Sequence, residues 1–315
     1  MAGMMLLSSA TIKVARAARM WVPAAVVVLM CCAMMMKGSV GQGTITTFQE
    51  SAYSSQFQVV WQPNNVWISN QGQVLELVVT QQSGTALQSL NSYLFGSFRV
   101  DLKLVPNDSA GVLTSFYLSS NGDHHDEVDF EFLGNSTGQP YVLQTNIFAA
   151  GVGGREQRIN LWFDPRDDFH TYSVIWNPIA ITLYIDNVLI RVFQNHEAQG
   201  QAYPNAQGMN VYSSVFDASS WATQGGLVPI DFSQAPFVSS YTNYGMDSCI
   251  FDATNPTACS YPQAGTWWNA QEYQSIPANR IDQLQWVQAD YMIYNYCTDN
   301  VRYPTPPFEC TAPLY

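Results

Sequence analysis

The sequence predicts an all-β fold, a sandwich or jelly roll built from many short strands. Between Thr44 and Phe232, short apolar or alternating segments follow one another with turn residues between them, a pattern typical of such folds. We find no long helical periodicity in this region. The composition agrees, because 47% of the residues are hydrophobic, 13% are aromatic and only 11% are charged. A long disordered tail would need less hydrophobicity and more charge.

The individual strands are identified by their alternation and by the turns that separate them. The predicted strands include Val74–Val79, Gly96–Leu104, Val112–Leu118, Glu127–Leu133, Thr171–Trp176 and Ile181–Ile185. Turns are predicted at pairs such as Asn121-Gly122 and Asn177-Pro178.

The composition changes after about Ser233. Residues 236–275 are rich in Tyr, Ser, Pro and Asn and predict a loop. A short helix is predicted over residues 277–289, where apolar residues recur at helical spacing (Ile281, Leu284 and Val287). Residues 291–297 alternate again and predict a strand. We expect an extension of the same domain with its own role; the alternative is a stapled flap packed onto the sandwich.

The first 41 residues predict a secretory signal peptide. Three basic residues precede an apolar run from Met20 to Met36, and small residues follow it. The alternative is an uncleaved anchor, because this run approaches the length of a membrane span. With the signal removed, we expect no stable membrane association.

The charge balance excludes some partners. The net charge is −12, and four of the 12 basic residues (Lys13, Arg16, Arg19 and Lys37) lie before position 42, where no acidic residue lies. The mature chain would keep 12 − 4 = 8 basic and 24 acidic residues, a net charge of −16. Nucleic-acid binding needs basic patches, so we expect no nucleic-acid partner, whereas neutral sugars remain compatible.

Four cysteines remain after the signal: Cys249, Cys259, Cys297 and Cys310. An even number in an exported chain indicates two disulfides. Of three possible connectivities, the simplest pairs Cys249 with Cys259 and Cys297 with Cys310. A zinc site is the competing interpretation, but no C-x₂-C spacing or nearby His supports it.

The segment from His125 to Gly134 carries the strongest functional signal. Alternate side chains of a strand share a face, so Glu127, Asp129 and Glu131 point one way. Three apolar residues between and after them (Val128, Phe130 and Phe132) point into the core. Two non-catalytic interpretations are a charged edge strand, which more often carries Lys, and a calcium site. We favour catalysis and expect no metal and no cofactor.

Glycosidic cleavage with retention explains these residue types. It needs one carboxylate as nucleophile and one carboxylic acid as proton donor, about 5–5.5 Å apart. Residues i and i+4 of a flat strand lie about 13 Å apart at Cα. The two glutamates must therefore lean together on a curved sheet. Asp129, between them, can hydrogen-bond the nucleophile and help keep the acid protonated.

The Glu-x-Asp-x-Glu pattern within His125–Gly134 resembles the active-site strand of glycoside hydrolase family 16. Other segments resemble the plant xyloglucan endotransglucosylase/hydrolases of that family: Tyr93–Gly96, Tyr117–Ser120, Leu161–Pro165, Asp168–Tyr172, Trp221–Thr223 with Gly225-Gly226, Trp286–Gln288 and Tyr291–Cys297. The resemblance covers essentially the whole mature chain. It implies that Glu127 is the nucleophile, Asp129 the helper and Glu131 the acid/base.

The resemblance also implies an architecture. A concanavalin-like β-jelly roll would span residues 42–235, and a C-terminal extension, residues 236–315, would lengthen the acceptor side. The family typically carries an N-glycan just after the catalytic strand, where Asn135-Ser136-Thr137 is a sequon. Asn107-Asp108-Ser109 is a second sequon without such support.

Sugar-binding residues are expected around the carboxylates. Gln144 and Asn146 share a face by alternation, and with Arg155 and Glu156 they match sugar-contacting positions of the family. Trp221 resembles the family's cleft tryptophan, and Gly226 belongs to the same motif. The alternative for Arg155 is a surface ion pair. Departures from the family pattern touch subsites rather than the catalytic strand: Gln224 replaces a common Arg, Phe232 replaces the usual Trp, and residues 83–90 lack a glycine and a lysine often found there.

We expect a secreted monomer, and the resemblance implies an enzyme of the plant cell wall and apoplast. It would cleave xyloglucan and pass the glycosyl unit to another xyloglucan chain or oligosaccharide. The alternatives are a xyloglucan endohydrolase, with water as acceptor, and a hetero-transglucanase acting on other β-glucans. A lectin-like wall-binding module is a third alternative, which the intact carboxylate triplet counts against.

Overall fold

The computed structural model describes residues 47–259 and 266–314; the predicted signal peptide, residues 1–41, lies outside the described residues. The strands are β1 Phe57–Trp61, β2 Val66–Ser69, β3 Val74–Val79, β4 Thr85–Lys103, β5 Val112–Ser119, β6 Glu127–Leu133, β7 Val142–Phe148, β8 Gln157–Asn160, β9 His170–Trp176, β10 Ala180–Ile185, β11 Val188–Gln194, β12 Met209–Asp217, β13 Phe237–Ile250 and β14 Met292–Asn295. One α-helix, α1, spans Ala278–Asp290. Short 3-10 helices include Thr223–Gly226, Phe232–Gln234, Trp267–Asn269, Tyr296–Thr298 and Phe308–Cys310.

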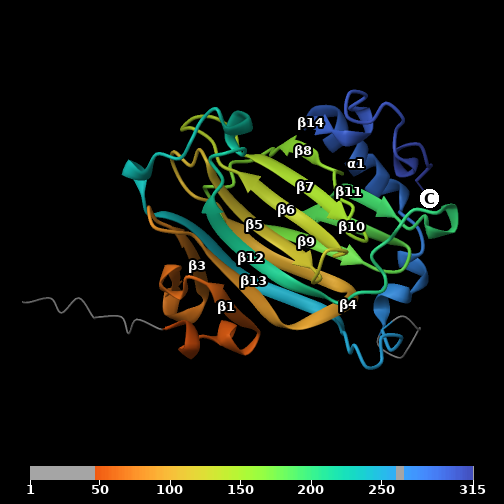
Figure 1. The fold of residues 1–315 in the computed structure, drawn as a ribbon, viewed down its shortest axis with the longest axis horizontal. Coiled ribbons are helices and arrows are strands. Elements are labelled where there is room, and N and C mark those ends of the chain that lie inside the picture. Colours follow the sequence, from red (N-terminus) through yellow and green to blue (C-terminus); the bar gives the residue numbers. More distant parts are fainter. Residues whose placement is uncertain (1–46, 260–265, 315) are drawn as a thin grey trace, which may run out of the picture. The chain divides into compact units, whose positions relative to one another are not determined.

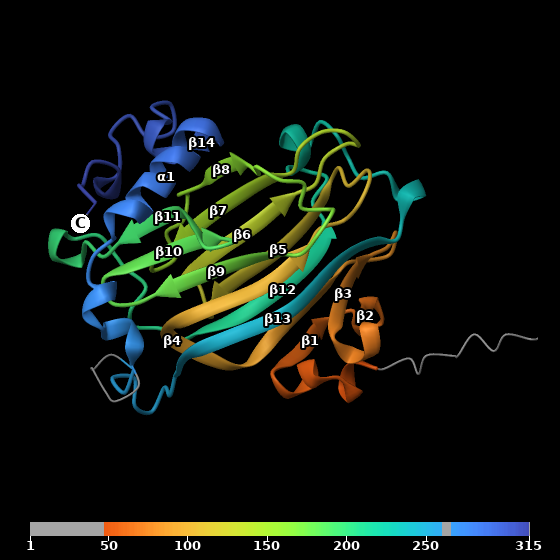
Figure 2. The same cartoon turned by 180° about the vertical axis from the view of Figure 1, so that it is seen from behind.

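The strands form two antiparallel layers that share the long strand β4 (Figure 1; Figure 2 shows the reverse side). The first half of β4 pairs with β12, which leads on through β5, β6, β7 and β8 to β14. Its second half pairs with β13 and with β9, which leads on to β10 and β11. The jelly-roll sandwich predicted from the sequence is confirmed, and the six predicted strands lie within or coincide closely with β3, β4, β5, β6, β9 and β10.

Strand β4 is longer than predicted because it serves both layers. It begins at Thr85, although the sequence predicted a strand only from Gly96. The passage between layers occurs around Phe95 and Gly96, which have φ values of +66° and +130°. Gly96 also lies against the backbone of Ser248 on β13. The glycine thus marks a close approach of two strands, and not the start of one.

The core lies between the two layers and receives the apolar face of β6. Val128, Phe130 and Phe132 are fully buried. Phe132 meets Tyr172 of β9 with 4.6 Å between ring centroids. Because these side chains anchor one face of β6, the alternate residues Glu127, Asp129 and Glu131 lie on the outer face of their layer.

The loop predicted for residues 236–275 is wrong over its first part. Residues 237–250 form β13, which pairs with β3 and then with β4. Phe237, Ser239 and Tyr241 are buried at a period of two. Ser and Tyr suggested a loop by composition, yet their alternation is that of a strand. Cys249 therefore lies on a strand of the sandwich.

The C-terminal segment is joined to the sandwich by pairing, by packing and by disulfides. Strand β14 pairs with β8, and α1 packs on β11 through Gln283, whose Oε1 accepts from Leu189 N at 3.2 Å. The disulfides join Cys249 to Cys259 and Cys297 to Cys310, with Cα–Cα distances of 5.7 and 5.3 Å. The predicted helix is confirmed, with Leu284 and Val287 buried. Among the described residues, no helix is long and apolar enough to span a membrane.

Candidate active site

The three carboxylates of β6 lie in the middle of their layer, flanked by β5 and β7. Glu127, Asp129 and Glu131 stand opposite Ser119, Tyr117 and Ser115 of β5. On the other side they stand opposite Phe148, Asn146 and Gln144 of β7. Asp129 is 6% exposed, and the two glutamates are half-buried. The register therefore brings Gln144 and Asn146 beside the carboxylates, on the face where the sequence predicted them.

A chain of hydrogen bonds orients Glu131. Gln144 Nε2 donates to Glu131 Oε2 at 2.6 Å. Arg158 Nε, on β8, donates in turn to Gln144 Oε1 at 2.7 Å, and its guanidinium carbon lies 5.5 Å from the ring centroid of Tyr294 on β14. The amide of Gln144 is thus fixed at both ends, so its nitrogen faces Glu131.

The surroundings of Glu131 favour its protonated form. Burial raises the pKa of Glu131, and the negative charges of Glu127 and Glu156 raise it further. The hydrogen bond from Gln144 and the charge of Arg158 lower the pKa but do not cancel the rise. A raised pKa favours the protonated form that a general acid needs.

Asp129 is the most strongly perturbed member of the triplet. Burial raises the pKa of Asp129 well above its ordinary value, and the charges of Glu127 and Glu131 raise it further. The charge of Arg191 acts in the opposite direction. A hydrogen bond to Glu127 also favours a proton on Asp129. These surroundings therefore favour a proton on Asp129, which suits a helper that hydrogen-bonds the nucleophile.

An open groove of about 390 Å³ passes over the triplet. Its lining includes Leu113, Ser115, Tyr117, Gln144, Asn146, Phe148, Glu156, Ser214 and Phe216 together with the three carboxylates. Larger grooves, of about 620 and 880 Å³, lie over the outer face of β9 and β10 and beside β1 and β2. Neither brings three interacting carboxylates together, so the chemistry belongs to the smaller groove.

Several residues near this groove were missed by the sequence analysis as site residues. Tyr117 of β5 stacks on Tyr212 of β12, with 4.8 Å between centroids and 10° between planes. Burial raises the pKa of both phenols, and the charge of the nearby Glu127 raises it further. Arg158, which holds Gln144, was also missed. Tyr117 belongs to the site because the pairing of β5 with β6 places it opposite Asp129. This register cannot be read from the local sequence.

The other predicted binding residues divide between the groove and its supports. Glu156 lines the groove and pairs with Arg302 at 2.6 Å. Arg155 instead forms a largely buried ion pair with Glu309 at 2.7 Å, close to the alternative considered for it. Its backbone N donates to Asn146 Oδ1 at 2.9 Å. Arg155 thus supports Asn146 from outside the groove.

Trp221 and Gly226 lie on the loop after β12, outside the lining of the groove. This loop is tied to the end of the catalytic strand, because Thr223 Oγ1 donates to Gly134 O at 2.7 Å. Gly226 has a φ of +89°, and a Cβ there would lie 2.4 Å from Ser220 O. Asn135, in the predicted sequon, donates from Nδ2 to Pro140 O at 3.0 Å.

The comparisons with known proteins agree with this geometry. The model of glycosyl hydrolases family 16 matches residues 53–234, and that of the xyloglucan endo-transglycosylase (XET) C-terminus matches residues 262–310. A probable xyloglucan endotransglucosylase/hydrolase protein 5 of Arabidopsis thaliana is 50% identical over 79% of this chain and 85% of its own length. A probable xyloglucan endotransglucosylase/hydrolase protein of Nicotiana tabacum is 48% identical over 81% and 86%.

A solved structure also resembles the fold. A Crh5 transglycosylase in complex with NAG superposes with a TM-score of 0.51 at 26% identity, covering 64% of this chain and 80% of its own. The family models, the relatives and the carboxylate strand all agree. The chain belongs to glycosyl hydrolases family 16 and, within it, to the plant xyloglucan endotransglucosylase/hydrolases.

Proposed function

We propose that this protein is a retaining xyloglucan endotransglucosylase, which cleaves the β-1,4-glucan backbone of xyloglucan and transfers the glycosyl unit to another xyloglucan chain or oligosaccharide. The observation that carries this proposal is the triplet on β6, three carboxyl groups side by side in an open groove, in which burial and like charges raise the pKa of Asp129 and of Glu131. The choice of xyloglucan as substrate follows from the names of the relatives, which include xyloglucan endotransglucosylases.

The first step forms a glycosyl-enzyme ester. The carboxylate of Glu127 attacks the anomeric carbon, and the glycosidic C–O bond breaks. Glu131 gives its proton to the leaving oxygen, so the fragment on the acceptor side departs with a free hydroxyl. Asp129 directs its proton toward Glu127, which sets the orientation and charge of the nucleophile.

The second step transfers the sugar. Esterification removes the charge of Glu127, which had helped to raise the pKa of Glu131. The pKa of Glu131 then falls, so the group is ready to act as a base. Its carboxylate takes the proton of an acceptor hydroxyl, whose oxygen attacks the anomeric carbon and releases Glu127. Two displacements restore the original β configuration.

The groove residues bind the chain, and those on and after β7 lie toward the acceptor side. Gln144, Asn146 and Glu156 present polar groups to sugar hydroxyls, and the stacked pair Tyr117–Tyr212 presents aromatic surface. Trp221 and Gly226 act from the loop after β12. Strands β8 and β14 with the C-terminal extension form the acceptor side, and Arg155 supports it.

The protein is proposed to act outside the cell, in the apoplast and wall, as a monomer. The basic and apolar pattern of residues 1–41 supports export. The mature chain is proposed to comprise a catalytic jelly roll to residue 235 and an extension from residue 236, whose first strand, β13, pairs within the sandwich, with a glycan on Asn135.

A labelled-acceptor assay tests the proposal. The protein is incubated with xyloglucan and a fluorescent xyloglucan oligosaccharide, and label in polymer is measured beside reducing ends. We expect label to enter the polymer, and Glu127→Ala to lower the rate by roughly 10⁴-fold or more while polysaccharide binding survives. Steady growth of reducing ends without incorporation would identify a hydrolase. Near-normal activity of Glu127→Ala would overturn the role of Glu127.

The same assay measures specificity. Mixed-linkage glucan and cellulose oligomers replace xyloglucan as donor or acceptor. Gln224→Arg and Phe232→Trp restore the residues common in the family. Because both positions lie outside the catalytic strand, comparing these variants with the wild type tests donor and acceptor preference separately from catalysis.

A further inference from the structure

Arg191 is a buried cation that the proposed reaction does not use. It lies on β11, in the layer opposite the carboxylates, and is 2% exposed. Its strand neighbour in register is Leu183, which faces the core. The side chain therefore runs through the interior toward the catalytic layer.

The guanidinium of Arg191 holds the backbone beneath the groove. Nη1 donates to both the carbonyl and the hydroxyl of Thr145, each at 2.8 Å. Thr145 lies on β7 between Gln144 and Asn146, and opposite Phe130 of the catalytic strand. Nη2 donates to the carbonyl of Arg155 at 2.6 Å. One side chain thus fixes the two segments that carry Gln144, Asn146 and Glu156.

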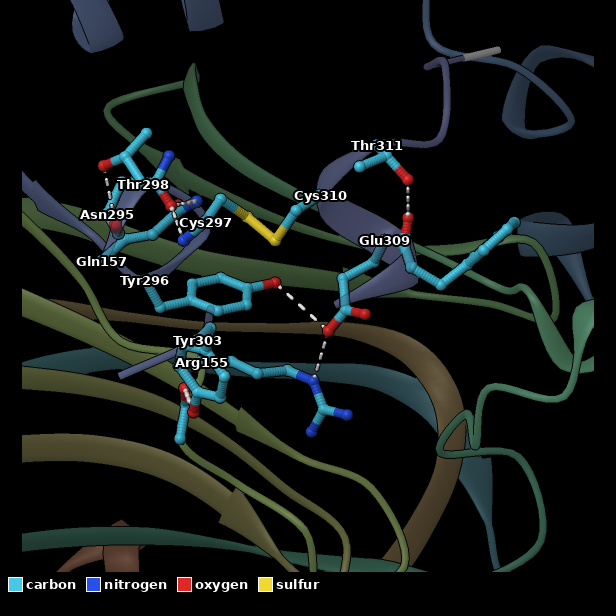
Figure 3. The surroundings of a disulfide bond; sticks show 12 residues. Arg155, Gln157, Asn295, Tyr296, Cys297, Thr298, Tyr303, Glu309, Cys310 and Thr311 are labelled. Atoms are coloured by element: carbon cyan, nitrogen blue, oxygen red, sulfur yellow. Dashed lines mark hydrogen bonds and ion pairs between the residues drawn. A yellow bond between two sulfur atoms is a disulfide. The ribbon is translucent and has the colours of Figure 1, made fainter. Parts of the chain in front are cut away.

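The same guanidinium adjoins the C-terminal extension. Its carbon lies 5.9 Å from the ring centroid of Tyr296, and Tyr296 OH donates to Glu309 at 3.3 Å. Glu309 accepts from Arg155 at 2.7 Å. Figure 3 shows Tyr296, Arg155 and Glu309 together beneath the disulfide of Cys297 and Cys310. The extension is therefore clamped to the segment that Arg191 supports.

Arg191 has no carboxylate partner at ion-pair distance among the residues that the structure describes. Burying a charge without such a partner is unfavourable, because the charge loses its hydration. An apolar side chain of similar size would avoid that cost. The guanidinium of Arg191 is thus present despite its cost in stability. It lies beneath the cluster of three carboxylates.

We propose that Arg191 is a positioning residue of the transfer reaction, which sets the acceptor side of the groove by fixing Thr145 and Arg155 and supplies the positive charge beneath the carboxylate triplet. This inference rests on the proposed function. Arg191 touches no sugar; it acts through Gln144, Asn146 and Glu156.

The positive charge of Arg191 has an effect that can be measured separately from its hydrogen bonds. Arg191 interacts with Tyr296, Arg155, Asp129 and Glu156, and its charge lowers the pKa of Asp129 against the rise caused by burial, Glu127 and Glu131. Removing the charge raises the pKa of Asp129 further. The pH profile of kcat/KM then moves to higher pH.

Two substitutions separate the effect of the guanidinium's hydrogen bonds from the effect of its positive charge. Arg191→Lys keeps a charge but cannot reach three acceptors in fixed geometry, whereas Arg191→Met keeps apolar volume alone. We expect both to raise the acceptor KM about tenfold, a smaller effect than the roughly 10²-fold loss of rate that a misplacement of about 1 Å can cause, with the donor KM within about twofold. Only Arg191→Met should shift the pH profile, toward higher pH, because only this variant loses the positive charge. Arg166→Met, at an ion pair with Asp164 away from the groove, is the matched control.

Wild-type acceptor KM in folded Arg191→Lys would overturn the inference, and this variant decides the question if Arg191→Met fails to fold. An unshifted pH profile in folded Arg191→Met would remove the electrostatic part. A wild-type protein that releases reducing ends without transfer contradicts the proposed function instead. Titration calorimetry with a xyloglucan oligosaccharide and Arg191→Lys then still decides the inference, since unweakened binding overturns it.

Discussion

At the level of single residues, three carboxyl groups of similar chemistry differ because their neighbours differ. Glu131 receives a hydrogen bond from Gln144 and stays half-buried. Asp129 lies deeper, between two glutamates, so its pKa rises well above the ordinary range. Charge and burial, rather than residue type, thus distinguish a helper from an acid.

Asp129→Asn should stabilise the protein at neutral pH while lowering its activity. The pKa of Asp129 is higher in the folded state than the ordinary 3.8, so its stabilising contribution is present below that value and is lost as pH rises through the folded-state pKa. Asparagine does not ionise. We expect a higher free energy of unfolding for the asparagine variant at pH 7, because its side chain carries no carboxyl group whose ionised form burial and two neighbouring charges disfavour.

Urea unfolding of both proteins at pH 3.5 and pH 7 checks this expectation. The two stabilities should nearly coincide at the lower pH and diverge at the higher. An asparagine variant that is less stable than the wild type at both values would contradict the account of Asp129.

The sequence predicted the central residues of the site because they lie on one strand. A period of two placed Glu127, Asp129 and Glu131 on one face without knowledge of the partner strands. Tyr117 and Arg158 come from other strands, and only the register of β5 and β8 brings them in. The side chain of Arg155 likewise points toward Glu309, which lies 154 residues further along the chain, so its orientation could not be predicted from the local sequence.

At the level of elements, long strands were the hardest to predict. Both β4 and β13 serve more than one partner, so their sequences change character along their length. In β13 the alternation of Phe237, Ser239 and Tyr241 gives way to a half-exposed stretch. Composition alone favoured a loop there, because burial by β3 and β4 is a non-local property.

Gly96→Ala tests the crossing of β4 between the layers. A Cβ at Gly96 would lie 2.4 Å from both Cα and Cβ of Ser248, and the backbone has a φ of +130°. We expect a loss of about 2–4 kcal/mol in the free energy of unfolding, from strain and steric overlap. Gly200→Ala is the control, because its φ is +87° but nothing lies within 4 Å of its Cβ. It should lose about 1 kcal/mol.

Chemical denaturation of the two glycine variants measures the difference. An equal loss in both would mean that backbone conformation alone matters at Gly96. The close approach of β13 would then have no role in fixing the crossing.

At the level of the whole molecule, the extension and the sandwich share one layer. Strand β14 continues the catalytic layer beyond β8, and the ion pair of Arg155 with Glu309 fixes the C-terminal 3-10 turn beside it. The sequence predicted the helix and a short strand in the extension from periodicity. It could not predict that this strand joins β8, because pairing over such separations leaves no local pattern.

The central claim is that Glu127 forms a covalent glycosyl ester that an acceptor sugar then resolves. The most direct test incubates the protein with xyloglucan alone, quenches in acid and maps peptides by mass spectrometry. We predict a glycosyl adduct on Glu127 that disappears when acceptor oligosaccharide is added before the quench, and no adduct in Glu127→Ala. An adduct on Glu131 or another residue of the active protein, or a product of inverted configuration, would contradict the account.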